Sequence, residues 1–99
     1  MIEVRLTVRF RRWLLSLKDE VARTMITARI DRLAQGNPGK VRSLGAGLSE
    51  MKVDHGPEYR VYFAKRGLTV VIILYGGDKT TQTKDIKAAQ KMIDKGEFE

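Results

Sequence analysis

The sequence predicts an α+β fold with the order β-α-α-β-β-β-α, in which a helical hairpin covers one face of an antiparallel sheet. Apolar residues recur at helical spacing between residues 10 and 33, and they follow strand patterns between residues 48 and 75. The length of 99 residues, 42% of them apolar, fits a single domain over residues 1–99 with a modest core.

The first third of the chain predicts one short strand and two helices. Residues 2–6 alternate in polarity, and Thr7 is placed to cap a helix. Asp19 is placed to cap a second helix that ends near Gly36, and the short loop between the helices predicts an antiparallel pair. The stripe of the first helix consists of Phe10, Trp13, Leu14 and Leu17. We expect Trp13 to pack in the core rather than to stack on a base.

Arg29 falls on the apolar stripe of the second helix, which predicts a structural role. Its side chain either reaches solvent or pairs with a carboxylate, and Glu50 is a candidate partner. Residues 40–44 lie between two glycine-rich turns and are expected to form a short or irregular strand.

Three strands from Leu48 to Tyr75 are expected to form an antiparallel meander. In the middle strand, alternation places Arg60 and Tyr62 on the open face, away from the helical hairpin. Residues 68–75 are apolar almost throughout and predict the central strand of the sheet.

The end of the chain predicts a turn followed by a helix. The pair of glycines at 76–77 is interpreted as a flexible turn. The helix is expected to begin around Thr80 or Thr81 and to end at Gly96. Its inward residues are expected to be Ile86, Ala89 and Ile93.

The charge balance predicts an anionic partner. The chain has 19 Lys and Arg against 12 Asp and Glu, a net charge of +7. Solvated helix faces explain part of this excess equally well. The chain has no cysteine and one histidine, which argues against disulfides and a catalytic zinc site, and we expect no cofactor. With no apolar run near 20 residues, we expect a cytoplasmic protein without membrane contact.

A small set of residues offers chemistry suited to RNA cleavage. Arg60 presents a fork of donors for a phosphate, and Lys52 and Lys79 add point charges. The 2′-hydroxyl of RNA attacks the adjacent phosphorus once a base removes its proton. His55 and Asp85 are the candidates for proton transfer. A histidine in a turn is often incidental, and the helix dipole alone explains an acid at position 85.

Other residues are candidates for contacts with RNA. Lys84 and Lys87 begin a row of lysines on the polar side of the last helix, which either follows phosphates or is a solvated surface. Tyr62 either stacks on a base or packs beneath that helix. Gln82, near the start of the helix, completes the residues that we expect to contact RNA.

Several short motifs occur together in a characteristic order. Gly56-Pro57-x-Tyr59-Arg60-Val61-Tyr62-Phe63 is followed by Leu74-x-Gly76-Gly77-x-Lys79-x-x-Gln82-x-x-Asp85-Ile86. Upstream stand Arg29-Ile30-x-Arg32-Leu33, Gly36-Asn37-x-Gly39 and Gly45-x-Gly47-Leu48-Ser49-Glu50. Over nearly its whole length the chain resembles the phage-derived addiction-module killer, HigB-like branch of the RelE/ParE toxin superfamily.

The resemblance implies a RelE-like fold and a toxin of a type II toxin-antitoxin module. Such toxins are held inactive by an antitoxin, with which they form oligomers, and many cut messenger RNA on the ribosome without a metal. Arg60 matches the arginine of the family's Tyr-Arg motif, and Lys79 matches the lysine after the paired glycines. Where several ribosome-dependent relatives carry Tyr or His near the C-terminus, this chain has Lys84-Asp85-Ile86. The alternatives are a ParE-like poison of DNA gyrase and a basic nucleic-acid-binding module.

Overall fold

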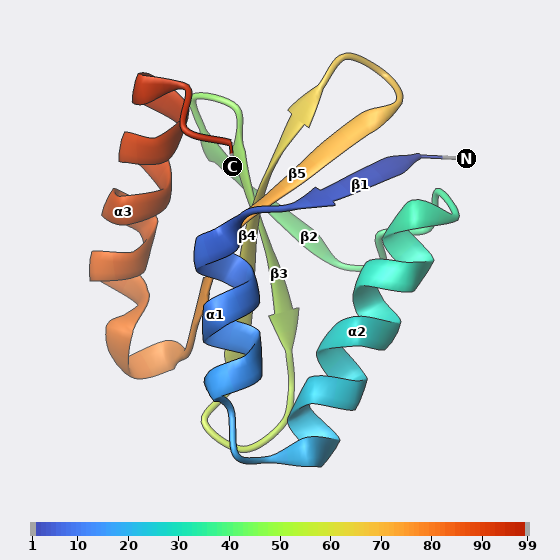
Figure 1. Cartoon of the computed structure of the whole chain (residues 1–99), viewed down its shortest axis with the longest axis vertical. Helices are drawn as coiled ribbons and strands as arrows, with labels where there is room; N and C mark the ends of the chain where they lie inside the picture. Colours follow the sequence, from blue (N-terminus) through green and yellow to red (C-terminus); the bar gives the residue numbers. More distant parts are fainter. Residues whose placement is uncertain (1, 99) are drawn as a thin grey trace.

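The computed structural model describes residues 2–98, which form a mixed sheet between helices (Figure 1). The α+β class and the helical pair are as predicted. No helix between residues 2 and 98 is long and apolar enough to cross a membrane. The elements in chain order are β1 (Glu3–Leu6), α1 (Val8–Ser16), α2 (Glu20–Ala34), β2 (Val41–Gly45), β3 (Leu48–Val53), β4 (Tyr59–Arg66), β5 (Val70–Gly77), the short 3₁₀ helix η1 (Lys79–Thr81) and α3 (Gln82–Lys95).

The five strands lie in the order β1-β5-β4-β3-β2. Strands β3, β4 and β5 form the predicted antiparallel meander, and the expected short strand after residue 40 is β2, which pairs with β3. Four strands therefore follow the two helices, where the predicted order β-α-α-β-β-β-α has three. The prediction of a wholly antiparallel sheet is wrong, because β1 runs parallel to β5, with Glu3 opposite Val70. Alternation in β1 indicated a strand but carried no information on its direction, which depends on the path of the chain through α1 and α2.

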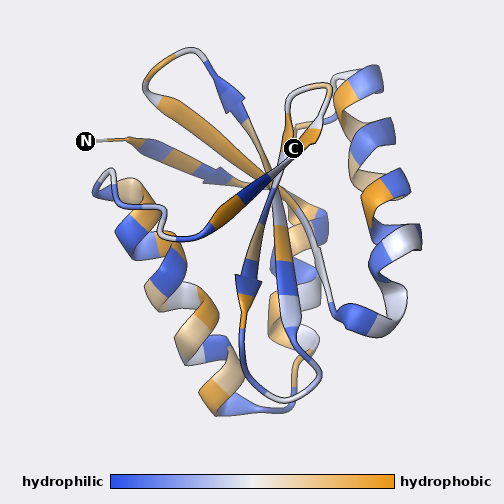
Figure 2. Cartoon of the chain, turned by 180° about the vertical axis from the view of Figure 1, so that it is seen from behind, coloured by the Kyte–Doolittle hydropathy of each residue, from blue (hydrophilic) through white to orange (hydrophobic). Residues whose placement is uncertain are grey.

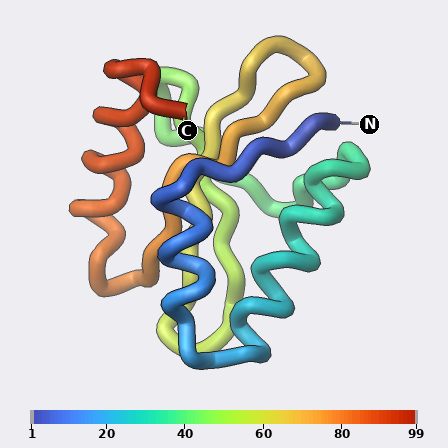
Figure 3. The backbone as a smooth tube through the Cα atoms, viewed as in Figure 1, coloured from blue at the N-terminus to red at the C-terminus, as the bar shows by residue number. Residues whose placement is uncertain are grey.

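The helix boundaries follow the predicted caps. The hydroxyl of Thr7 accepts a hydrogen bond from the backbone N–H of Phe10, and Asp19 accepts bonds from the first turn of α2. Gly96 ends α3 in the left-handed conformation, with φ of 66°. The chain reverses direction between α1 and α2, so that the two helices form the expected antiparallel pair (Figure 3).

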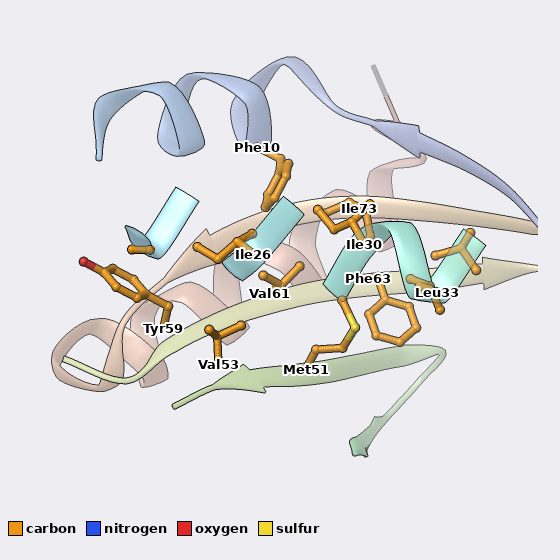
Figure 4. Packing of buried hydrophobic residues seen from close by; sticks show 12 residues of the cluster. Phe10, Ile26, Ile30, Leu33, Met51, Val53, Tyr59, Val61, Phe63 and Ile73 are labelled. Carbon is orange, nitrogen blue, oxygen red and sulfur yellow. The ribbon is translucent and has the colours of Figure 1, made fainter. Parts of the chain in front are cut away.

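Apolar side chains are buried on both faces of the sheet, and Figure 2 shows apolar residues concentrated along the central strands. On one face α1 and α2 pack on the strands (Figure 4), and this cluster includes Phe10, Ile26, Ile30, Leu33, Met51, Val61, Phe63 and Ile73. On the other face α3 packs on a second cluster that includes Leu48, Tyr62, Ala64, Ile72, Leu74, Ala89 and Met92. The predicted register of β4 is therefore confirmed, because alternate residues of this strand belong to opposite clusters.

The prediction that the paired glycines form a flexible turn is wrong. They are the last two residues of β5, and both are buried. A Cβ atom on Gly76 would lie 2.2 Å from Cε3 of Trp13, and one on Gly77 would lie 1.7 Å from the carboxylate of Asp85. Each glycine therefore admits a side chain from one helical layer against the backbone of the strand. Trp13 packs on the core between Phe10 and Tyr59, as expected.

The prediction that residues 68–75 form the central strand is wrong in two respects. The central strand is β4, and β5 lies between β4 and β1. Leu68 lies outside the strand altogether, since β5 begins at Val70. Its side chain is 97% exposed at the tip of the β4–β5 hairpin. The apolar run in the sequence therefore extends beyond the strand that it identifies.

The close contact between Gly76 and Trp13 gives a test of the packing. Gly76→Ala should lower the free energy of unfolding by about 1–3 kcal/mol, because its methyl group overlaps the indole ring. Urea unfolding of Gly76→Ala, Trp13→Ala and the double variant measures this cost. With the indole removed, the alanine should cost much less, and strictly additive costs would show that the two residues do not compete for the same space.

Candidate functional site

Two rows of side chains cross the sheet on the face that α3 partly covers. Directly paired residues of neighbouring strands project to the same face, and Lys52, Arg60 and Gly77 are paired across β3, β4 and β5. The next row contains Arg42, Glu50, Tyr62 and Tyr75 from β2 to β5. Lys52, which the sequence offered as a point charge for the same phosphate as Arg60, is thus the residue directly opposite Arg60 on β3.

Glu50 is the centre of the polar contacts in these rows. Its carboxylate lies 3.1 Å from Nη2 of Arg42 and 3.3 Å from Nε of Arg60, and it accepts a 2.9 Å hydrogen bond from Nε2 of Gln82. The residue is only 6% exposed. A buried carboxylate is costly unless paired and hydrogen-bonded, and two cations and an amide meet that requirement here. Glu50 thus joins β2, β3, β4 and α3.

Arg60 is buried and only partly satisfied, which corrects the expectation that it stands on an open face. It is 8% exposed, and the carboxylate of Glu50 lies against its guanidinium. Nε is at ion-pair distance from Glu50 but is not aligned as a hydrogen bond, and Nη1 also has no partner among the described residues. A buried donor without an acceptor costs about 1–3 kcal/mol. The guanidinium is therefore held in place with unused capacity to bind an acceptor.

A groove opens beside this guanidinium, and we call it the Arg60 groove. Its volume is about 300 Å³. Four of its six lining residues are cationic and one is acidic, namely Lys40, Val41, Arg42, Glu50, Lys52 and Arg60. The excess of positive charge over Glu50 makes the groove suited to an anion with several oxygen atoms.

Glu58 holds the two lysines that were predicted to assist Arg60. Its carboxylate lies 3.2 Å from Nζ of Lys52 and 3.6 Å from Nζ of Lys79. Lys52 also contacts Asp54 at 3.2 Å, and Asp54 first and Glu58 second raise the pKa of Lys52. Lys52 in turn lowers the pKa of Glu58. The raised pKa keeps Lys52 charged near the end of the Arg60 row, whereas Lys79 is largely exposed and does not line the groove.

Asp85 lies over the end of the same row. It is 5% exposed in the first turn of α3, and its carboxylate accepts a 2.6 Å hydrogen bond from the hydroxyl of Thr81. Burial raises the pKa of Asp85 despite this hydrogen bond. The carboxylate of Asp85 packs against the backbone of Gly77, and Gly77 is paired with Arg60 on the neighbouring strand.

The structure places His55 away from these residues. Its Nε2 lies 2.8 Å from Oδ2 of Asp19, the residue that caps α2. Within residues 2–98 no hydrogen bond or ion pair joins His55 to the Arg60 groove. The interpretation of His55 as a structural residue is thus the one that its contacts support.

Tyr62 has no exposed surface, so it packs beneath α3 and is not available to stack on a base in this conformation. Its hydroxyl has no hydrogen-bond partner in the described residues, and burial, with Glu50 and Asp85 nearby, raises the pKa of Tyr62. Gln82 is also committed within the protein, through its bond to Glu50. Tyr62 and Gln82, two of the residues expected to contact RNA, therefore make contacts within the protein instead.

The remaining predicted residues lie elsewhere. Lys84 and Lys87 are exposed on α3 and line a second, larger groove that does not include Arg60. Arg29 does not pair with its candidate partner Glu50 among the described residues. Its guanidinium donates hydrogen bonds to the carbonyl oxygens of Lys52, Pro38 and Lys40, at 2.8, 3.2 and 3.3 Å, and so fixes the segment before β2 against β3.

Sequence reasoning missed three residues of the site, Arg42, Glu50 and Glu58. A signal for Glu50 was present, because alternation places it on the same face of β3 as Lys52, which faces Arg60. Glu58 carried no such signal, since it stands in a turn with a φ of 60°. Residues with positive φ are rare outside glycine, and sequence gives little warning of them.

Comparison with known proteins gives a family for most of the chain. Residues 12–97 match the family described as "Phage derived protein Gp49-like". An "Uncharacterized protein" of Haemophilus influenzae is 45% identical over 89 residues, which cover 90% of this chain and 90% of the relative. No solved structure matches.

The link between His55 and Asp19 gives a pH test. The hydrogen bond from His55 first, and that from the N–H of Ala22 next, lower the pKa of Asp19 below 3.8. A carboxylate with a depressed pKa stabilises the fold above its unfolded pKa, and this contribution is lost as the pH falls through the folded value. Wild type should therefore be more stable than Asp19→Asn at neutral pH, and the difference should shrink below about pH 4.

Thermal unfolding from pH 7 to pH 2.5 measures this difference, with Asp31→Asn in the same helix as the matched control. Asparagine also caps helices, so the comparison isolates the charge. A gap between wild type and Asp19→Asn that stays constant with pH would contradict this role of the carboxylate.

Proposed function

The chain belongs to the family of phage-derived Gp49-like proteins, and from this premise we propose that it is the toxin of a type II toxin-antitoxin module. We propose further that it cleaves messenger RNA on the ribosome. The observation that carries the proposal is the buried guanidinium of Arg60, which has two nitrogen atoms without hydrogen-bond partners beside a cationic groove.

The scissile phosphate is proposed to bind in the Arg60 groove. Two phosphate oxygens match one planar edge of a guanidinium, and at the edge formed by Nη1 and Nη2 they would supply the acceptor that Nη1 lacks once a shift of the side chain exposes this buried nitrogen. Lys52 lines the groove and Lys79 shares its carboxylate partner, so both add positive charge near the same phosphate. This charge stabilises the additional negative charge that builds on the phosphate in the transition state.

The nucleophile is proposed to be the 2′-hydroxyl of the RNA itself. Its oxygen attacks the adjacent phosphorus, the bond to the 5′-oxygen of the next nucleotide breaks, and the products are a 2′,3′-cyclic phosphate and a 5′-hydroxyl. One proton leaves the attacking oxygen and one is delivered to the leaving oxygen. This chemistry requires from the protein only a bound phosphate and groups that move protons.

Of the two candidates for proton transfer, His55 and Asp85, we propose Asp85. It lies over the row that contains Arg60, whereas His55 is bound to the cap of α2. A raised pKa brings a carboxyl group closer to the pH at which it both accepts and donates protons. The Gly77 backbone and the Thr81 hydroxyl fix its position.

The family and the arrangement of layers also support a RelE-like fold and an antitoxin as partner. A helical pair covers one face of the sheet, and the Arg60 groove opens on the other. Two faces of different character allow a toxin to be bound by its antitoxin and its target through separate contacts.

Substitutions of Arg60 should separate phosphate binding from stability. Arg60→Lys keeps a charge beside Glu50 but loses the fork, so it should weaken phosphate binding in the transition state by about 1.5–3 kcal/mol and reduce growth arrest on induction. Arg60→Ala also leaves Glu50 with one cation fewer and should lower the free energy of unfolding by up to about 3 kcal/mol. Lys79→Ala, at an exposed position, should have the smallest effect.

The double variant Arg60→Ala with Glu50→Gln is the control for folding. Neutralising the carboxylate should recover part of the lost stability without restoring toxicity. Growth arrest and urea unfolding are measured for each variant. A folded Arg60→Lys or double variant with full toxicity would remove Arg60 from the site.

Asp85→Asn tests proton transfer. Asparagine keeps an oxygen for the Thr81 hydroxyl and has no charge to desolvate, so stability should stay equal or rise. Loss of the proton-transfer group should slow transcript cleavage by about 10²–10⁴-fold. Unchanged cleavage by this variant would exclude Asp85 from the chemistry.

The choice of target is tested with purified protein added to translating ribosomes and, separately, to gyrase with supercoiled DNA. The proposal predicts transcript cleavage that requires the ribosome, and no inhibition of gyrase. Gyrase inhibition without transcript cleavage would overturn the proposal in favour of a ParE-like poison.

A further inference from the structure

A second groove lies between α1 and α3, and we call it the α1–α3 groove. Its volume is about 650 Å³, roughly twice that of the Arg60 groove. Its charged lining residues are five cations and one acid, Arg9, Lys84, Lys87, Lys91, Lys95 and Glu97. The two grooves have no lining residue in common.

The cations of the α1–α3 groove differ from those of the Arg60 groove in their ion pairs. Between residues 2 and 98, none of the five takes part in an ion pair. In the Arg60 groove, by contrast, Glu50 lies against Arg42 and Arg60, while Lys52 contacts Asp54 and Glu58. The larger groove therefore keeps its charge available to an external anion.

The four lysines form one row along α3. They stand at positions 84, 87, 91 and 95, a spacing of three or four residues that keeps them on one face of a helix. With a rise of about 1.5 Å per residue, neighbouring lysines are about 4.5–6 Å apart along the axis. Like charges at this spacing repel one another and weaken the helix. A linear polyanion would relieve this repulsion along the whole row.

The lining favours a phosphate backbone over an acidic protein. Protein interfaces depend on apolar and aromatic anchors in pockets, and the apolar lining here is limited to Ala88 and to Met92, which is 3% exposed. Lysines supply point charges that contact phosphates without reading bases. The row also leads towards the Arg60 groove, because Gln82, two residues before Lys84, is bonded to Glu50.

We propose that the α1–α3 groove binds the phosphate backbone of an RNA strand, independently of its base sequence. This inference deepens the proposed function and rests on it for the identity of the nucleic acid. The groove supplies affinity along the strand, while the Arg60 groove holds the phosphate at which cleavage takes place.

Binding of a fluorescein-labelled 2′-O-methyl oligoribonucleotide, followed by anisotropy at increasing salt, tests this inference. The blocked 2′-oxygen prevents cleavage, so the measurement does not depend on activity. The test variant has glutamine at all four lysines, Lys84, Lys87, Lys91 and Lys95. The matched control loses the same charge at exposed cations outside the groove, Arg11, Lys18, Arg32 and Lys65.

The lysine variant should bind the probe at least tenfold more weakly at low salt. Its slope of log K against log salt should be shallower by about 3, since each phosphate contact with a single strand contributes about 0.7. The control should keep the slope of wild type. A further variant with arginine at the four positions should also keep the salt slope of wild type, because it keeps the four charges. This variant shows whether weaker binding by the lysine variant results from lost charge or from damage to α3.

Equal salt slopes for wild type and the lysine variant would overturn the inference. So would an equal loss of affinity for the probe in the lysine variant and in the control. A polyglutamate peptide that displaces the RNA probe at equal charge concentration would identify an acidic protein as the ligand and would also overturn it. Failure here is distinct from failure of the proposed function. If wild type cleaves transcripts and the lysine variant binds the probe as well as wild type does, only the role of the α1–α3 groove is rejected. If probe binding depends on the lysines but wild type cleaves no transcript, only the proposed nuclease activity is rejected.

Discussion

The carboxylate of Glu50 is the interaction on which the arrangement of the candidate site depends. It lies between Arg42 of β2 and Arg60 of β4, and Gln82 ties it to the start of α3. Glu50 has 6% of its surface exposed, and burying a carboxylate is costly unless partners such as these remain in place. Arg60 depends on Glu50 in the same way, because it is nearly as buried, whereas the side chain of Arg42 is largely exposed. One buried charge therefore fixes the edge strand, the central hairpin and the last helix relative to one another.

The same interaction explains why Arg60 is both rigid and unsatisfied. Ion pairing to Glu50 compensates the buried positive charge, but the geometry leaves Nε and Nη1 without hydrogen-bond partners. Holding the guanidinium in place limits the reorganisation that phosphate binding requires to exposing these buried nitrogen atoms, which favours transition-state stabilisation. The α1–α3 groove has the opposite character, with exposed lysines that form no ion pair within residues 2–98, and suits contacts that are numerous and individually weak.

Local signals in the sequence predicted much of the fold. Thr7 and Asp19 cap their helices as expected, because a cap depends on residues within one turn. Alternation gave the correct face for Arg60, since one register alone buries Val61 and Phe63 beneath the helical pair. The parallel pairing of β1 with β5 was not predictable in this way, because it depends on contacts between distant parts of the chain.

The site was less predictable than the fold for the same reason. Arg60 and Lys52 were found from their strands, but the role of Glu50 requires β2 and α3 to be in place. The paired glycines had the composition of a turn, and only the layers on either side show that Trp13 and Asp85 require them. A charged residue in a buried strand is a signal for such networks, yet its partner cannot be chosen until the strands are ordered.

The chemical ends of the cleaved RNA test the central claim most directly. Ribosomes carrying a defined messenger RNA are treated with the protein, and the termini of the products are identified, with a second message that has a single 2′-deoxynucleotide before the scissile phosphate. The account predicts a 2′,3′-cyclic phosphate and a 5′-hydroxyl, and no cut at the deoxy position. A 3′-hydroxyl with a 5′-phosphate, or cleavage after the deoxynucleotide, would contradict it.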